Sequence, residues 1–228
     1  NTRIVYYETR TKPFYSDADG IIGDALGHGS HVSGSILGNG GLSTTVVKAP
    51  GSGKAPYPAN QFTGMATNAN LVMLEDFNSF PHSNLVNISY QQGARVMNNS
   101  WGNSVYDYGT MCAEWDAYVR DSDSATAGSQ ELAVFFSAGN DGAGLTDGTG
   151  GSAQTVGQPG NAKNVITVGA VEQRRLCDNL PNPPYDSILE TDSEWQLASF
   201  SSRGPTPDGR IKPDIVAPGG FVMSIQTR

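Results

Sequence analysis

The chain has 228 residues, and its 22 acidic and 14 basic side chains give a formal net charge of −8. This length suits one large α/β domain or two small ones, and such a chain can bury a core without disulfides or metals. It contains no run of Lys and Arg, so it lacks the clustered positive charge that nucleic-acid backbones require. Its longest apolar run, at 132–138, is far shorter than the roughly 20 residues of a membrane span. We therefore expect no nucleic-acid partner and no membrane span.

The composition is rich in glycine and poor in charge. Glycine accounts for 28 residues, and 16% of the side chains are charged. This balance is typical of loop-rich secreted enzymes, and we expect an extracellular protein. Cys112 shares an apolar stripe with Trp115 and Val119, which favours a buried free thiol. A disulfide to Cys177 is the alternative.

Strands and helices alternate along the chain, and this predicts an α/β fold with a mostly parallel central sheet in a single domain over 1–228. Helical spacing is clearest at 110–122, and the apolar run at 132–138 suits a buried parallel strand. Ser83 is expected to cap a helix that Gly93 ends. The expected strands are 4–7, 70–75, 94–100, 132–138, 165–171, 197–200 and 214–217; the expected helices are 28–38, 83–93 and 110–122; and the long loops are 41–62, 142–160 and 173–197.

Polar clusters follow this alternation at the places where a parallel α/β sheet gathers its sites, the carboxyl ends of strands. The first holds His28 between Gly27 and Gly29, where a helix is expected to begin. The positive end of the helix dipole favours a neutral imidazole, and a general base needs that form. The alternative for an isolated histidine is a capping or buried structural role, and we assign a packing role to His31. A zinc site on the two histidines is disfavoured, because the Glu of His-Glu-x-x-His is missing.

Two further clusters end strands in glycine turns. Asn140 follows Gly139 after the strand at 132–138, and its amide can donate to an oxyanion in acyl transfer. The alternative is an ordinary turn, because Gly-Asn-Asp-Gly is common turn chemistry. The segment 98–102 ends the preceding strand, and its edge can pair with an extended peptide. Its alternative is an ordinary strand end.

With 200–205 and 212–219, these segments resemble the subtilisin-like serine peptidases, or subtilases, in their order and spacing. The resemblance covers most of 24–219. The 41–62 loop and the segments 160–170 and 208–214 look most like the oxidatively stable alkaline protease branch. The resemblance implies a three-layer subtilisin-like fold and an endopeptidase that cleaves peptide bonds through a Ser-His-Asp triad.

The family pattern His-Gly-Thr-His-Val-Ala-Gly falls on 28–34, with Ser30 and Ser33 in place of Thr and Ala. The resemblance makes His28 the triad base and leaves His31 structural. It also makes Asn140 the oxyanion-hole amide.

Three further residues take binding roles from the same resemblance. Ser100, Trp101 and Gly102 match the segment that lines the primary specificity pocket and pairs with the substrate backbone. Trp101 stands where a leucine is common. Gln158-Pro159-Gly160 matches a turn that often holds a cis proline, so Pro159 is expected to be cis.

The chain departs from the family pattern at the other two triad members. The serine motif Gly-Thr-Ser does not occur, and Ser224 follows Ala-Pro-Gly too closely to replace it. Asp17, Asp19 and Asp24 lie in the loop before His28, so none of them ends a strand. We therefore expect a fragment, truncated at both ends, that folds poorly alone and hydrolyses nothing.

No cofactor is expected for the chemistry. The resemblance implies structural calcium with unknown ligands, and the loop 141–147 offers oxygen atoms. We expect a monomer that acts on a peptide or protein substrate. The alternatives are a non-catalytic peptide-binding pseudopeptidase and a metal hydrolase. An enzyme and a pseudopeptidase differ in whether the flanking sequence carries the Gly-Thr-Ser motif.

Overall fold

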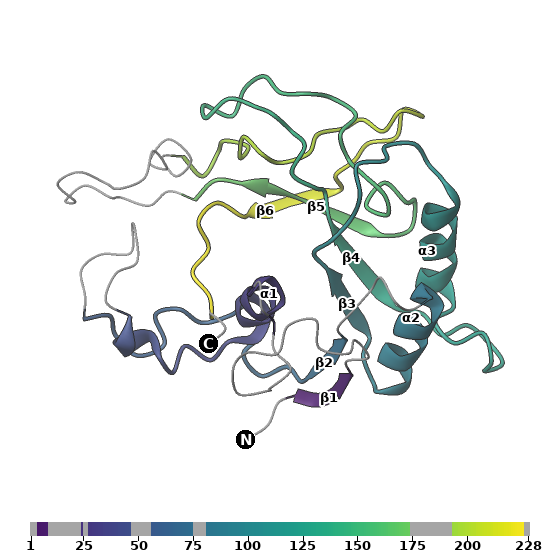
Figure 1. Cartoon of the computed structure of the whole chain (residues 1–228), viewed down its shortest axis with the longest axis horizontal. Coiled ribbons are helices and arrows are strands. Elements are labelled where there is room, and N and C mark those ends of the chain that lie inside the picture. Colours follow the sequence, from purple (N-terminus) through teal and green to yellow (C-terminus); the bar gives the residue numbers. More distant parts are fainter. Residues whose placement is uncertain are drawn as a thin grey trace. The chain divides into compact units, whose positions relative to one another are not determined.

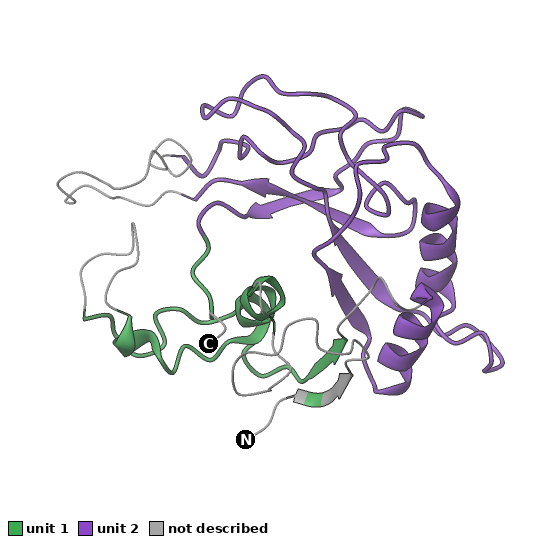
Figure 2. Ribbon diagram, in the orientation of Figure 1, with its two compact units in different colours: residues 1–79, 175–183, 222–228 green, residues 80–174, 184–221 purple. Residues whose placement is uncertain are grey.

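The computed structural model describes residues 4–8, 24, 27–46, 56–74, 81–173 and 193–225. The chain divides into two compact units (Figure 2). Unit 1 contains residues 1–79, 175–183 and 222–228, and unit 2 contains 80–174 and 184–221. The single catalytic domain over 1–228 stays a prediction.

Unit 1 combines a small parallel sheet with one helix (Figure 1). Strands β1 (Ile4–Glu8) and β2 (Leu71–Leu74) pair in parallel, and α1 (His28–Leu37) lies between them in sequence. The strands expected at 4–7 and 70–75 and the helix expected at 28–38 are thus confirmed. The loop expected at 41–62 contains a single 3₁₀ turn, η1 (Ser43–Thr45), in its described part.

Unit 2 holds a four-stranded sheet with the order β3-β4-β5-β6, and every neighbouring pair is parallel. The strands are β3 (Val96–Asn99), β4 (Ala133–Ser137), β5 (Ile166–Val171) and β6 (Ile215–Pro218). The expected parallel sheet is therefore confirmed, with strand ends shifted by one or two residues.

Helices α2 (His82–Gln91) and α3 (Thr110–Arg120) lie on the same side of this sheet (Figure 1). Trp115 of α3 packs edge-to-face against Phe136 of β4, with ring centroids 4.8 Å apart. Burial of each large apolar side chain contributes about 1.5–3 kcal/mol. The buried core cluster comprises Val86, Cys112, Trp115, Leu132, Val134, Phe136, Ala162 and Val165.

The helical spacing predicted at 110–122 is confirmed by α3, whose apolar stripe faces this core. Cys112 is a buried free thiol, as expected, and its Sγ donates a hydrogen bond to Asn161 Oδ1 at 2.7 Å. Burial raises the pKa of this thiol, since the thiolate loses its hydration. Cys177 lies outside the described residues.

Three expectations about elements were wrong in detail. Strand β4 is buried on one face only: Val134 and Phe136 are buried, while Ala133 and Ser137 are exposed, because both helices cover the same face. Helix α2 begins at His82 after Pro81, so Ser83 is inside the helix and caps nothing. The Pro81 carbonyl accepts the N–H of Asn84 at 2.9 Å instead.

The third concerns 197–200, which forms no strand. Leu197 makes one isolated antiparallel bridge to Val171, and the chain then turns, with Ser201 N donating to Ala198 O at 3.0 Å. The loop predicted at 173–197 is described only at its two ends. In the parts of the chain that the structure describes, no helix combines the length and apolar character needed to cross a bilayer.

Candidate active site

A pocket of about 290 Å³ opens in unit 2 where β3 and β4 end. Its lining is mostly backbone and small side chains: Ser100, Trp101, Gly102, Asn103, Ser104, Ser137, Ala138, Gly139, Asn140, Asp141 and Gly157. Four residues singled out from sequence therefore meet in one pocket, because parallel strands bring their carboxyl ends to one edge. The fifth, His28, belongs to unit 1.

One wall of the pocket continues β3. Asn98 Nδ2 donates to Ser100 Oγ at 3.0 Å, and Trp101 Nε1 donates to Asn99 Oδ1 at 3.1 Å. The Trp101 ring lies 5.2 Å from that of Phe136, edge-to-face. The indole therefore packs against the core and also lines the pocket. A leucine could pack there but could not donate the hydrogen bond to Asn99.

The same wall is held in place by the turn at Gln158. Gln158 O accepts the N–H of Asn103 at 2.8 Å, and Gln158 N donates to Val105 O at 2.9 Å. A Cβ on Gly102 would lie 3.0 Å from Gln158 O, so this close approach favours glycine. The Gln158–Pro159 bond is cis, as the sequence predicts.

The opposite wall carries Asn140 on a sharp turn. Gly139 has φ +105°, a left-handed conformation that glycine adopts without strain. Ala138 N donates to Val168 O at 2.9 Å, which anchors the turn to β5. The Asn140 side chain is exposed at the pocket, and no described residue hydrogen-bonds to its amide. The amide is therefore available to donate to a bound group.

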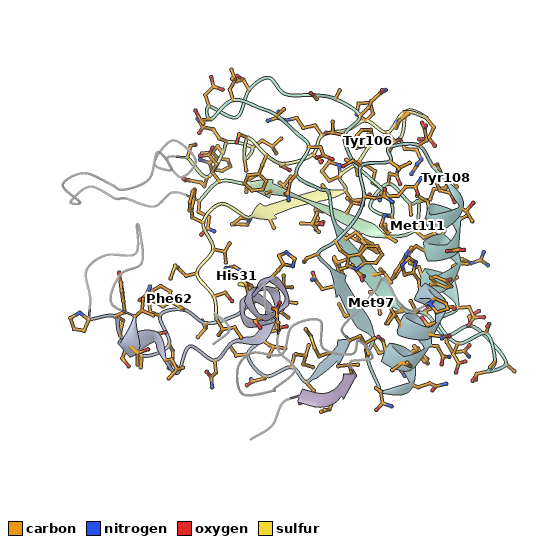
Figure 3. All side chains as sticks on the ribbon, in the orientation of Figure 1. His31, Phe62, Met97, Tyr106, Tyr108 and Met111 are labelled. Atoms are coloured by element: carbon orange, nitrogen blue, oxygen red, sulfur yellow. The ribbon has the colours of Figure 1, made fainter. Side chains whose placement is uncertain are left out.

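Asp141 connects the two walls. Its Oδ2 accepts hydrogen bonds from Ser104 Oγ at 2.9 Å and from the Tyr106 hydroxyl at 3.2 Å. Figure 3 places Tyr106 on the segment between β3 and α3. Asp141 is the one charged residue among those that line the pocket. Sequence reasoning missed this role, because 37 residues separate the carboxylate from Ser104 and no local pattern links them.

A partly buried polar network supports the Tyr106 segment from α3. The Tyr108 hydroxyl donates to Asp116 Oδ2 at 2.7 Å, and Asn164 N donates to Asp116 Oδ1 at 2.6 Å. The hydrogen bond to Asp116, reinforced by burial and by the negative charge of that carboxylate, raises the pKa of Tyr108 to about 12. Asn161 Nδ2 donates to Tyr106 O at 2.6 Å. This network fixes the segment that carries the Tyr106 ring.

In unit 1, His28 is exposed and is the first residue of α1, as expected. Gly27 precedes it with φ +72°. Asp24 was seen in the sequence only as a loop residue, yet its Oδ2 accepts the N–H of Ser30 at 2.6 Å. Asp24 thus satisfies a free N–H in the first turn of α1 and places a negative charge at the positive end of the helix dipole.

His31 is engaged with the backbone. Its Nε2 lies 2.9 Å from Val222 O, so this nitrogen carries the proton and donates it. Ser224 Oγ donates to His31 O at 2.6 Å. A Cβ on Gly34 would lie 2.3 Å from Ser224 Oγ, so α1 and the 222–225 segment approach closely only with glycine there. These contacts agree with the structural role assigned to His31.

The described residues contain no group of three or more His, Cys, Asp or Glu side chains placed to hold a metal ion. In the loop 141–147, the carboxylates of Asp141 and Asp147 accept hydrogen bonds from neighbouring side chains. Structural calcium stays a prediction.

Comparison with known proteins agrees with these features. The model of the subtilase family matches residues 3–227. The chain is 28% identical over 217 residues to the serine protease AprX of Bacillus subtilis, covering 90% of this chain and 40% of that protein. It is 29% identical over 202 residues to bacillopeptidase F of the same organism, covering 88% of this chain and 12% of that protein. The chain thus spans less than half of either relative.

Two solved structures share the fold. The psychrophilic protease S41 superposes with a TM-score of 0.54 at 22% identity, covering 94% of this chain and 59% of that one. Sphericase superposes with a TM-score of 0.52 at 21% identity, covering 88% of this chain and 55% of that one. Since the family model matches nearly the whole sequence, and the parallel sheet agrees with that match, the chain belongs to the subtilase family.

Proposed function

We propose that the protein containing this chain is a serine endopeptidase, with His28 as general base and Asn140 as oxyanion donor. The observation that carries the proposal is the pocket in unit 2. It gathers Ser100, Trp101 and Gly102 against the exposed amide of Asn140. A cleft that only held peptide would need the first three residues and would have no use for a free amide donor beside them.

In this mechanism a serine hydroxyl adds to the substrate carbonyl and passes its proton to His28. The oxyanion that forms accepts a hydrogen bond from the Asn140 amide. As the C–N bond breaks, His28 returns the proton to the leaving amine, and water then releases the acyl group by the same steps in reverse. We assign the serine and the aspartate that orients His28 to parts of the full-length protein outside these 228 residues.

We also infer that the 228 residues alone are inactive and only marginally folded. Among the described strands, β3 is an edge of its sheet, and Val96 on that strand is 65% exposed. An edge strand has unpaired backbone groups, and with an exposed apolar side chain it can pair with another strand. We expect an extracellular monomer that acts on a peptide or protein substrate. The glycine-rich, weakly charged composition supports the extracellular location.

The test is fluorophosphonate labelling and peptide hydrolysis with the full-length protein. His28→Ala should abolish labelling, because the serine then has no base. Asn140→Ala should lower kcat by about 10²–10³ with little change in KM, the usual effect of removing one oxyanion donor. Asn84→Ala, which removes an exposed amide on α2, is the matched control and should retain full activity.

A full-length protein that takes up no label and hydrolyses no peptide would contradict the proposal. If that protein still bound peptide in the pocket, the non-catalytic peptide-binding module would be the correct alternative.

A further inference from the structure

The backbone around Asn140 is held by a segment that lies about 60 residues away in sequence. Ser202 N donates to Gly139 O at 3.0 Å, and Ser202 Oγ accepts the N–H of Asp141 at 3.1 Å. Gly142 N donates to Phe200 O at 3.0 Å. The residues on both sides of Asn140 are therefore bonded to the segment 200–203. Ser202 is fully buried, so water does not compete for these bonds.

Arg203 extends this attachment with its side chain. Its guanidinium donates through Nη1 to Gly142 O at 3.4 Å. A Cβ on Gly144 would lie 2.2 Å from Nη2, and a Cβ on Gly151 would lie 1.4 Å from Nη1. The guanidinium thus occupies space that only glycines leave open in the loop 142–151. Its backbone is fixed independently, because Arg203 N donates to Thr155 Oγ1 at 2.9 Å.

The buried guanidinium lowers the stability of the fold, and a positional role would explain why this position carries an arginine. Nη2 of Arg203 is buried and has no hydrogen-bond partner among the described residues. Leaving a buried donor unsatisfied costs about 1–3 kcal/mol. A smaller apolar side chain at this position would avoid that cost, but it would not reach the Gly142 carbonyl.

We propose that Ser202 and Arg203 are positioning residues that hold the Asn140 amide in the geometry that oxyanion binding requires. This rests on the proposed function. Ser202 fixes the backbone on both sides of Asn140, and Arg203 fixes the loop that follows it. Neither side chain lines the pocket, so both act through the Asn140 turn.

The first experiment measures amide hydrogen exchange in the full-length protein. Ser202→Ala and Arg203→Gln should each speed exchange at Asp141 and Gly142, because the turn opens more often. Arg95→Gln is the matched control. Arg95 also donates to backbone carbonyls, those of Tyr90 and Ala94, but it is exposed and lies outside the pocket lining. Its substitution should leave both amides unchanged.

The second experiment separates kcat from KM. A misplacement of about 1 Å can cost about a hundredfold in rate, so Ser202→Ala and Arg203→Gln should each lower kcat by about ten- to a hundredfold. KM should change less than about twofold, because the rest of the pocket is intact. Arg203→Lys should recover most of the lost kcat, since an ammonium group can still donate to Gly142 O. A purely structural role would lower the amount of folded enzyme and leave kcat per labelled site unchanged.

A further variant tests the guanidinium position without removing the guanidinium. Gly144→Ala places a methyl group against Arg203, and should reproduce the kcat loss of Arg203→Gln. If Gly144→Ala and Arg203→Gln disturb the same contact, the variant that combines them should have a kcat no lower than that of either single variant.

Exchange rates that stay at the wild-type value, or a kcat per labelled site that does not fall, would overturn the proposal. These outcomes are distinct from a failure of the proposed function. If the proposed function is wrong, the wild-type protein itself will take up no fluorophosphonate, and the positioning role will then be wrong as well.

Discussion

The hydrogen bond from Tyr108 to Asp116 gives a measurable contribution to the stability of unit 2. The acceptor is a nearly buried carboxylate, and the distance of 2.7 Å is that of a charge-assisted bond. Tyr108→Phe removes the donor and leaves the ring in place. Asp116 keeps the N–H of Asn164 at 2.6 Å, so its charge is not left without partners.

We expect the variant to lower the free energy of unfolding by about 1.5–3 kcal/mol near pH 8, the usual contribution of a hydrogen bond to a charged group. The loss of unfolding free energy should lie at the lower end of this range, because Tyr108 is only half-buried. Urea unfolding of the full-length protein, followed by tryptophan fluorescence, is a suitable assay, since Trp101, Trp115 and Trp195 all belong to unit 2.

The pH dependence gives a second and independent check. The pKa of Tyr108 is raised from 10 to about 12, so the folded state holds this proton more tightly than the unfolded state. The stabilisation is therefore complete below pH 10 and is lost as the pH rises from 10 through 12. The difference between wild type and Tyr108→Phe should accordingly narrow between pH 8 and pH 11.

Tyr90→Phe is the matched control. The Tyr90 ring binds the Arg95 guanidinium at 3.8 Å from its centroid, and loss of the hydroxyl should change stability by about 0.5 kcal/mol or less. The reasoning is refuted if Tyr108→Phe costs no more than Tyr90→Phe at pH 8. It is also refuted if the difference from wild type is the same at pH 11.

Three further outcomes follow from the contacts. Asp141→Asn should lower kcat/KM of the full-length enzyme about 1.4- to fivefold for substrates that place Lys or Arg in the pocket, as an exposed charge pair contributes about 0.2–1 kcal/mol; equal losses for a leucine substrate would contradict this. Gly34→Ala should destabilise unit 1, since its Cβ would lie 2.3 Å from Ser224 Oγ. An unchanged melting temperature would show that the segment 222–225 moves away from the new methyl group without cost. Phe136→Ala should cost about 3–5 kcal/mol in urea unfolding, and a cost near 1 kcal/mol would mean that the core collapses around the cavity.

Most of the fold could be predicted because it depends on local patterns. The spacing of Trp115 and its neighbours predicted α3, and the alternation of strands and helices predicted a parallel sheet. The errors had local causes of a different kind. Pro81 displaced the start of α2 from the position that Ser83 indicated. The expected strand near Leu197 became a single bridge, because the chain turns back at Ser201.

The residues of the site likewise divide into those that local patterns predict and those that they do not. Asn140 and Trp101 could be found because glycine turns after strands leave a recognisable pattern. The bonds of Asp141 to Ser104 and Tyr106 could not, since they join segments that are far apart in sequence and depend on side-chain positions. Asp24 lay close to His28, but its capping role becomes visible only when the backbone of α1 is known.

The sequence by itself determined the family, the parallel sheet and the residues that carry the proposed chemistry, because each depends on short motifs in a given order. The tertiary structure alone decided which strand ends share a pocket, and it showed that the Asn140 turn is held by the segment 200–203. It also decided that Arg203 needs Gly144 and Gly151 beside it. These are contacts between residues distant in the chain, and no local propensity encodes them, since they arise only when the sheet brings the loops together.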